Sequence, residues 1–82
     1  MREFQLSILS PEKKIYNGKA VYCAISTFDG DMGIEAYHEP FMATLKKGSV
    51  LRYKTNSGDE TSVDVSNSIV SFENNVCTVL MG

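Results

Sequence analysis

Apolar and polar residues alternate along much of this chain, a pattern typical of β-strands that bury one face. The alternating segments are short, and turn residues lie between them. We expect strands over Phe4–Leu9, Lys13–Tyr16, Ala20–Phe28, Phe41–Leu45, Ser49–Lys54, two parts of Thr61–Phe72, and Val76–Leu80. Phe41, Met42 and Leu45 also have helical spacing, but this segment is too short for a stable helix.

Residues that favour turns separate the predicted strands. Ser10-Pro11-Glu12 ends the first strand, because proline lacks the amide hydrogen that a sheet requires. Asn17-Gly18 suits the positive φ angles of a tight hairpin turn, so we expect a hairpin there. Further turns are expected at Lys46-Lys47-Gly48, Asn56–Asp59, Asn67-Ser68 and Asn74-Asn75.

The longest β-like run, Ala20–Phe28, carries apolar atoms on both of its faces. Val21, Cys23 and Ile25 share one face, and the other face includes Tyr22. This pattern favours a strand between two packed layers. We therefore predict an all-β fold, a two-sheet antiparallel β-sandwich or flattened barrel of roughly 8–10 short strands. The length of 82 residues suits one domain over residues 1–82.

The charge balance excludes several classes of partner. A net charge of −2 with scattered Lys and Arg argues against nucleic-acid binding, and so against an oligonucleotide-binding barrel. Lys13-Lys14 and Lys46-Lys47 are too short to be polybasic membrane anchors. No apolar run approaches the roughly 20 residues that span a bilayer. We expect a soluble, cytoplasmic protein with no direct membrane insertion.

The two cysteines, Cys23 and Cys77, lie within apolar runs. We expect two buried free thiols in a reducing compartment, although a disulfide stays open. One histidine and two distant cysteines show no recognised metal-ligand spacing, so no metal and no cofactor is expected.

The stretch Phe28–Phe41 combines glycines, acidic residues and the only histidine, His38. An enzyme would need His38 with a carboxylate and a hydroxyl. The available groups are Asp29, Asp31, Glu35, Glu39, Ser26 and Thr44. No nucleophile-elbow or metal-ligand spacing accompanies them, and a domain this small has little room for a deep pocket. We therefore expect no catalytic activity.

The segment Gly30–Gly33 also lacks the features of two common loops. It has neither the lysine nor the following helix of a phosphate-binding loop, and its oxygen ligands are not spaced as in a calcium loop. We expect a glycine-articulated loop that displays acidic side chains beside Met32 and Ile34. Acidic groups around a small apolar centre are typical of a protein-binding surface.

Several short motifs occur in a recognisable order. They are FQLSILSPE at Phe4–Glu12, GDMGI at Gly30–Ile34, then His38, Pro40-Phe41, LKKG at Leu45–Gly48, and NNVCTVL at Asn74–Leu80. In order and spacing this set resembles the ε subunit of F-type ATP synthases. That family typically reads F-x-L-x-(V/I)-(V/L)-(S/T)-P-E, G-E-(L/M)-G-(I/V), P-G-H-x-P-L, a leucine with a K-P-G turn, and N-x-V-T-V-L.

The resemblance implies a β-sandwich in the central stalk of the synthase. Such a domain binds the γ subunit and rests on the ring of membrane c subunits. Through these contacts it helps to couple proton flow to ATP turnover. The residues that match the family's c-ring contacts are Asp29, Asp31 and Met32, and those that match its γ-subunit contacts are Ser10, His38 and Thr44. It further implies a non-catalytic subunit without a cofactor, peripheral to the inner (plasma) membrane.

This sequence departs from the family pattern at three places. Ala36-Tyr37 replaces the usual P-G before the histidine, and Ser66-Asn67-Ser68 replaces a glycine-rich S-G-G. The sequence ends at Gly82, where most members continue into two helices that inhibit ATP hydrolysis. We expect either a naturally short ε subunit or a piece of a longer one.

A stand-alone β-sandwich carrier or peptide-binding module is the alternative. A biotinyl-type carrier has a similar length and an all-β fold. It needs a modifiable lysine between two methionines, and Met-Lys-Met does not occur here. The rotor subunit is therefore the leading hypothesis.

Overall fold

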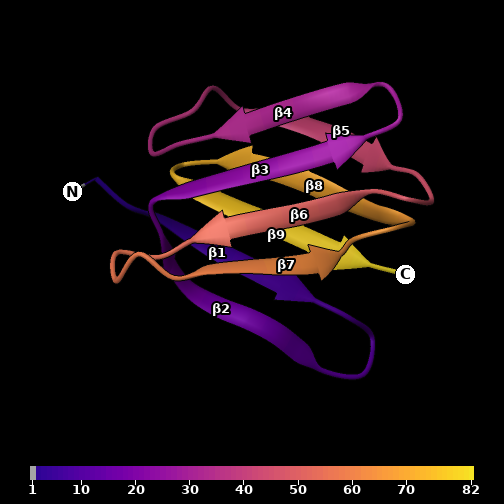
Figure 1. Ribbon diagram of the computed structural model, residues 1–82, viewed down its shortest axis with the longest axis horizontal. Coiled ribbons are helices and arrows are strands. Elements are labelled where there is room, and N and C mark those ends of the chain that lie inside the picture. Colours follow the sequence, from indigo (N-terminus) through magenta and orange to yellow (C-terminus); the bar gives the residue numbers. More distant parts are fainter. Residues whose placement is uncertain (1) are drawn as a thin grey trace.

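A computed structural model describes residues 2–82, and nine strands within this range form the fold (Figure 1). The strands are β1 (Phe4–Leu9), β2 (Lys14–Ala20), β3 (Tyr22–Thr27), β4 (Gly30–Ile34), β5 (Phe41–Leu45), β6 (Val50–Lys54), β7 (Glu60–Asp64), β8 (Ser68–Glu73) and β9 (Val76–Met81). Over residues 2–82 there is no helix long and apolar enough to cross a membrane.

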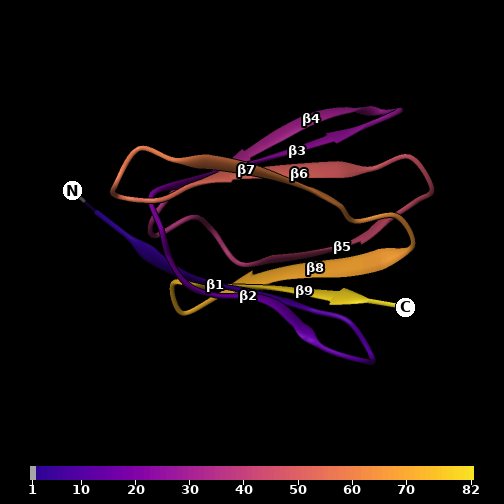
Figure 2. The same ribbon diagram turned by 60° about the horizontal axis from the view of Figure 1, so that its bottom comes forward.

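The strands form two sheets that lie face to face, as Figure 2 shows. One sheet has five strands in the order β2-β1-β9-β8-β5, and the other has four in the order β4-β3-β6-β7. Neighbouring strands run antiparallel except β1 and β9, which pair in parallel. The part of the chain that is described is thus an all-β sandwich and not a closed barrel, which confirms the predicted class.

The core lies between the sheets and follows the period of two seen in the sequence. Phe4, Leu6 and Ile8 of β1 all point inward and are fully buried. The ring of Phe4 meets the edge of the Phe72 ring at a centroid distance of 5.8 Å. The other buried apolar residues are Ala20, Cys23, Ile25, Ile34, Leu45, Leu51, Tyr53, Val65, Val70, Cys77 and Val79.

The predicted hairpin turn at Asn17-Gly18 is wrong. Both residues lie inside β2, and the chain turns earlier, where the Ser10 amide donates a hydrogen bond to the Lys13 carbonyl. The Asn17 amide oxygen instead accepts hydrogen bonds from Gln5 Nε2 (2.7 Å) and Ser7 Oγ (2.9 Å) on the neighbouring strand. Asn-Gly therefore stabilises the pairing of β1 with β2 here.

Two other element boundaries also differ from the prediction. The run Ala20–Phe28 is interrupted at Val21, where the chain crosses from β2 in one sheet to β3 in the other. Gly30–Ile34 is not a loop but the edge strand β4, which pairs with β3 in a tight hairpin. Two glycines and an acidic residue hid the strand from sequence patterning, because all three are rare in strands.

Among residues 2–82, four non-glycine residues have left-handed backbone conformations. Asn74 (φ 53°) and Asn75 (φ 62°) form the predicted turn between β8 and β9. Asn67 (φ 59°) and Tyr37 (φ 64°) stand where the resemblance leads one to expect glycine. Asparagine tolerates this region, whereas for tyrosine it is strained. The Tyr37 amide is held by the Asn75 side-chain oxygen at 2.8 Å.

Candidate protein-interaction surfaces

The turn between β3 and β4 forms a tip at one end of the sandwich. Thr27 Oγ1 accepts a hydrogen bond from the Asp29 amide (3.1 Å) and donates one to the Gly30 carbonyl (2.9 Å). Gly30 has φ 134°, a conformation that is open mainly to glycine. Phe28 and Asp29 are left at the apex, where both side chains are exposed. This end of the molecule therefore presents its side chains on a defined backbone.

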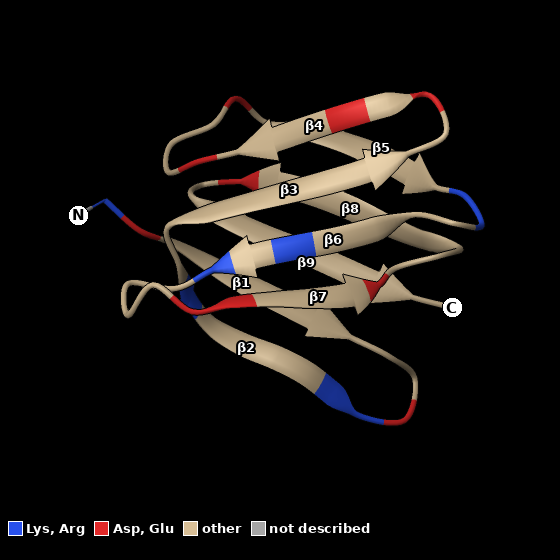
Figure 3. Cartoon of the chain, viewed as in Figure 1, with Lys and Arg blue, Asp and Glu red and all other residues tan. Residues whose placement is uncertain are grey.

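The three residues matched to a c-ring contact lie together beside this tip. Asp29, Asp31 and Met32 line one shallow hollow of about 240 Å³. The hollow lies at the open edge of the sandwich, and its remaining lining residues are Ile25, Thr27, Gly30 and Leu45. Figure 3 shows acidic residues at the turn and on β4. The structure thus offers an acidic rim around an apolar floor.

Two of the three residues matched to a γ contact are Thr44, the first member of one row on the outer face of the five-stranded sheet, and Ser10, which lies next to the last member of that row. Thr44 pairs with Ile69, Ile69 with Leu80, and Leu80 with Leu9 across successive strands. Ser10 follows Leu9 directly. The row crosses four strands, so about 14 Å separates its first and last members.

Apolar residues that sequence reasoning had not selected fill this row. Ile69 is 45% exposed and Leu80 is 51% exposed, and Met42 on the next row is 76% exposed. We call Leu9, Met42, Ile69 and Leu80 the apolar strip. Neighbouring exposed apolar side chains on one sheet face mark a contact surface more reliably than single ones.

The outer face of the four-stranded sheet is different. Cross-strand neighbours there include Ala24, Arg52 and Ser62 in one row and Tyr22, Lys54 and Glu60 in the next. Figure 3 shows that β6 carries basic residues. Only the five-stranded sheet therefore presents a mainly apolar outer row.

His38 lies just before the first residue of β5, whereas Thr44 is near the opposite end of this strand. Its ring meets the edges of Phe41 (5.2 Å between centroids) and Phe72 (5.7 Å), and its Nδ1 lies 2.8 Å from the Glu39 carbonyl oxygen. The structure therefore does not bring His38 and Thr44 together as a catalytic pair. Among residues 2–82 no group of His, Cys, Asp and Glu side chains could hold a metal ion.

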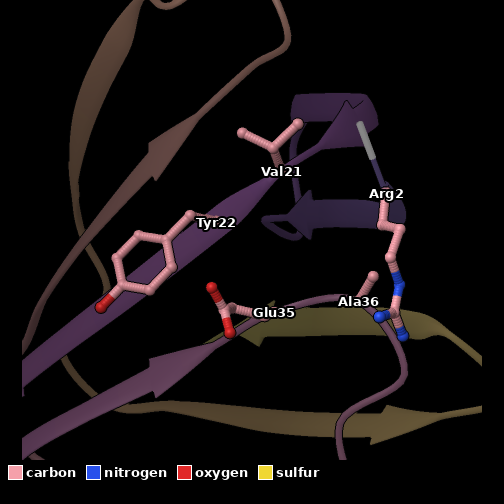
Figure 4. A pocket seen from close by; sticks show the side chains of 5 residues that line it. All are labelled: Arg2, Val21, Tyr22, Glu35 and Ala36. Carbon is pink, nitrogen blue, oxygen red and sulfur yellow. The ribbon is translucent and has the colours of Figure 1, made fainter.

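A wider groove of about 390 Å³ lies at the end of the molecule that holds the N-terminus. Arg2, Val21, Tyr22, Glu35 and Ala36 line it (Figure 4). The Arg2 guanidinium lies 4.9 Å from the centre of the Tyr37 ring. The groove brings together one guanidinium, one carboxylate and one phenol, and no motif in the sequence indicated it.

Cys23 and Cys77 are both fully buried and are not bonded to each other, as the sequence predicted for free thiols. Burial raises the pKa of the Cys77 thiol to about 12. Burial also raises the pKa of Cys23, and the neighbouring Cys77 raises it further. Both groups stay protonated and unreactive at neutral pH.

Comparisons with known proteins agree with this architecture. The family model described as ATP synthase, Delta/Epsilon chain, beta-sandwich domain matches residues 3–82. The ATP synthase epsilon chain 2 of Photobacterium profundum is 35% identical over 77 residues, 94% of this chain and 52% of its own length. The epsilon chain of Neisseria gonorrhoeae is 32% identical over 80 residues, 98% and 57% of the two chains.

Two solved assemblies contain a chain of the same fold. A chain of the Euglena gracilis mitochondrial ATP synthase, solved as OSCP/F1/c-ring, matches 99% of this chain and 51% of its own, with a TM-score of 0.87 and 19% identity. A chain of the Tetrahymena thermophila mitochondrial ATP synthase, solved as central stalk and c-ring, also has this fold. The match covers 95% of this chain and 63% of that chain, with a TM-score of 0.76 and 15% identity.

This chain spans little more than half the length of the curated relatives that it matches. The family match nevertheless covers all nine strands, from β1 to β9. The chain therefore belongs to the family of ATP synthase delta/epsilon chain β-sandwich domains.

Proposed function

We propose that this chain is a non-catalytic rotor subunit of an F-type ATP synthase. In this role it binds the γ subunit and the ring of c subunits, and so helps couple ion flow to ATP synthesis. Family membership and the epsilon-chain relatives support the proposal. The two solved assemblies, described as OSCP/F1/c-ring and as central stalk/c-ring, contain chains of the same fold.

The apolar strip is the observation that carries the proposed γ contact. It lies between Ser10 and Thr44, which the resemblance had assigned to γ independently of any structure. An interface of standard size buries about 800 Å² on each partner. The ring of His38 packs against Phe41 and the buried Phe72, so the assignment of His38 to the γ contact rests on the resemblance alone.

The end of the sandwich formed by the β3–β4 hairpin is the proposed footing on the c-ring. Asp29, Asp31 and Met32 line one hollow there. Through these contacts the subunit is held at the periphery of the inner (plasma) membrane on its cytoplasmic side. A carrier module is not favoured, because the family match runs from residue 3 to residue 82.

Binding of purified γ subunit to this chain tests the γ contact. We expect Ile69→Lys to weaken binding by about tenfold or more, because it places a charge in an apolar contact of roughly 1.5–3 kcal/mol. Ser62→Lys, on the outer face of the four-stranded sheet, is the matched control and should bind like the wild type. If the unmodified chain forms no complex with γ, the proposed function is wrong.

Charge reversal at Asp31 tests the division of the two contacts. We expect Asp31→Lys to weaken attachment to isolated c-rings by roughly tenfold, with γ affinity changed less than about twofold. Asp31 is exposed on β4, so the substitution should not disturb the core. Equal losses for both partners, or unchanged assembly, would contradict this assignment.

A further inference from the structure

Phe28 is the most exposed large apolar side chain among residues 2–82, at 95% of its full surface. It occupies the apex of the β3–β4 turn. Its ring lies beside the turn that follows β5, where a side-chain carbon added at Gly48 would sit 3.5 Å from the ring. Nearly all of the phenyl group therefore stands in water.

The fold does not explain why this residue is phenylalanine. The turn is held by Thr27 Oγ1 and by the backbone of Gly30, and neither contact involves the Phe28 side chain. The second position of such a turn accepts most residue types. Because the ring buries so little surface, it adds almost nothing to folding. An exposed phenyl group on a fixed backbone is instead suited to insertion into a partner.

The charges around Phe28 indicate the kind of partner. Asp29, Lys46 and Lys47 line the small hollow that Phe28 also lines, and Asp29 and Asp31 line the next hollow. Figure 3 shows the acidic and basic groups at this end of the molecule. Anionic membranes attract clusters of basic residues, and here two acids offset two bases. An aromatic side chain within a rim of mixed charge is typical of the centre of a protein–protein contact.

We propose that Phe28 is the apolar anchor of the contact with the c-ring and that it inserts into an apolar recess between side chains of both signs. This inference rests on the proposed function, because Phe28 adjoins Asp29 in the proposed c-ring footing. It adds Phe28, which the resemblance did not assign, to the proposed c-ring contact. The same geometry makes Lys46 and Lys47 part of the rim of that contact.

Binding of the whole chain to detergent-solubilised c-rings tests the anchor. We expect Phe28→Ala to weaken c-ring binding about 10- to 100-fold and Phe28→Leu to weaken it less than about fivefold. Both variants should melt within about 3 °C of the wild type, because the ring is not part of the core. Met42→Ala, on the apolar strip, is the matched control and should leave c-ring binding unchanged.

Two parallel measurements separate the possible failures. If the wild type binds γ and the c-ring but Phe28→Ala binds the c-ring equally well, the proposal that Phe28 is an anchor is wrong, and the proposed function stands. If the wild type binds neither partner, the proposed function fails and the anchor fails with it. Vesicles of anionic lipid without c-ring provide the third arm. Phe28-dependent binding to them would overturn the assignment to a protein partner.

Discussion

The buried thiols of Cys23 and Cys77 should make the protein sensitive to alkaline pH. The two residues lie on β3 and β9, in opposite sheets, and both side chains point into the core. Burial raises the pKa of Cys77 from 9.0 to about 12 and raises that of Cys23 as well. Removal of both thiols is the informative perturbation.

The sign and size of the effect on stability follow from the difference between the thiol pKa values in the folded and unfolded states. Above pH 9 the unfolded thiols lose their protons, while the folded ones keep theirs up to about pH 12. The contribution of the two thiols to stability is therefore fully present below pH 9 and is lost between pH 9 and about pH 12. At pH 10 each thiol lowers the free energy of unfolding by about 1.4 kcal/mol, so both lower it by about 3 kcal/mol. The total free energy of unfolding of a domain of this size is roughly 4–12 kcal/mol.

Urea unfolding followed by circular dichroism, in reducing buffer at pH 7.5 and pH 10, measures this effect. The control is the double variant Cys23→Ala/Cys77→Ala. The double variant should be less stable than the wild type at pH 7.5, because the substitutions leave cavities in the core. Between pH 7.5 and pH 10, however, its free energy of unfolding should fall by about 3 kcal/mol less than that of the wild type. Burial also raises the pKa of Tyr16, but that contribution is common to both proteins and cancels. Equal losses in the two proteins would refute the reasoning.

Two further substitutions test the turns that position the contact surfaces. Asn75→Ala should lower the free energy of unfolding by about 1–3 kcal/mol in urea titrations, because Asn75 accepts from the Tyr37 amide and donates to the Glu3 carbonyl; an unchanged midpoint would contradict this. Gly30→Ala should cost about 1–2 kcal/mol, because φ at Gly30 is 134°. Gly82→Ala, outside the strands, is its control, and equal midpoints for the two variants would show that the hairpin backbone is not constrained as described.

Side-chain alternation predicted most strands because it reports directly which face is buried. Phe4–Leu9 is one such case, with alternate residues fully buried. Alternation could not interpret Asn17-Gly18, because the same dipeptide suits a turn or a strand. Its role was decided by Gln5 and Ser7 across β1, which supply hydrogen bonds that no local pattern reveals. The parallel pairing of β1 with β9 was missed for the same reason.

The contact surfaces were predictable only in part. The acidic residues Asp29 and Asp31 stood out by composition, and the structure brings them to one hollow. Ile69 and Leu80 did not stand out, because an apolar residue in a strand is usually assigned to the core. Which of Val79 and Leu80 faces outward depends on the register with β8, where Val79 pairs with Val70 inside the core. That register is a tertiary property.

The parallel pairing of β1 with β9 also governs when the protein can fold during its synthesis. β9 lies between β1 and β8, so the five-stranded sheet stays in two separate parts until residues 76–81 have left the ribosome. Until then the strand edges that will hold β9 are unpaired, and such edges invite association with other chains. Contacts this distant in sequence also slow folding. A pause in translation before residues 76–81 have left the ribosome would therefore expose the nascent chain to aggregation, whereas a pause after they have left would not.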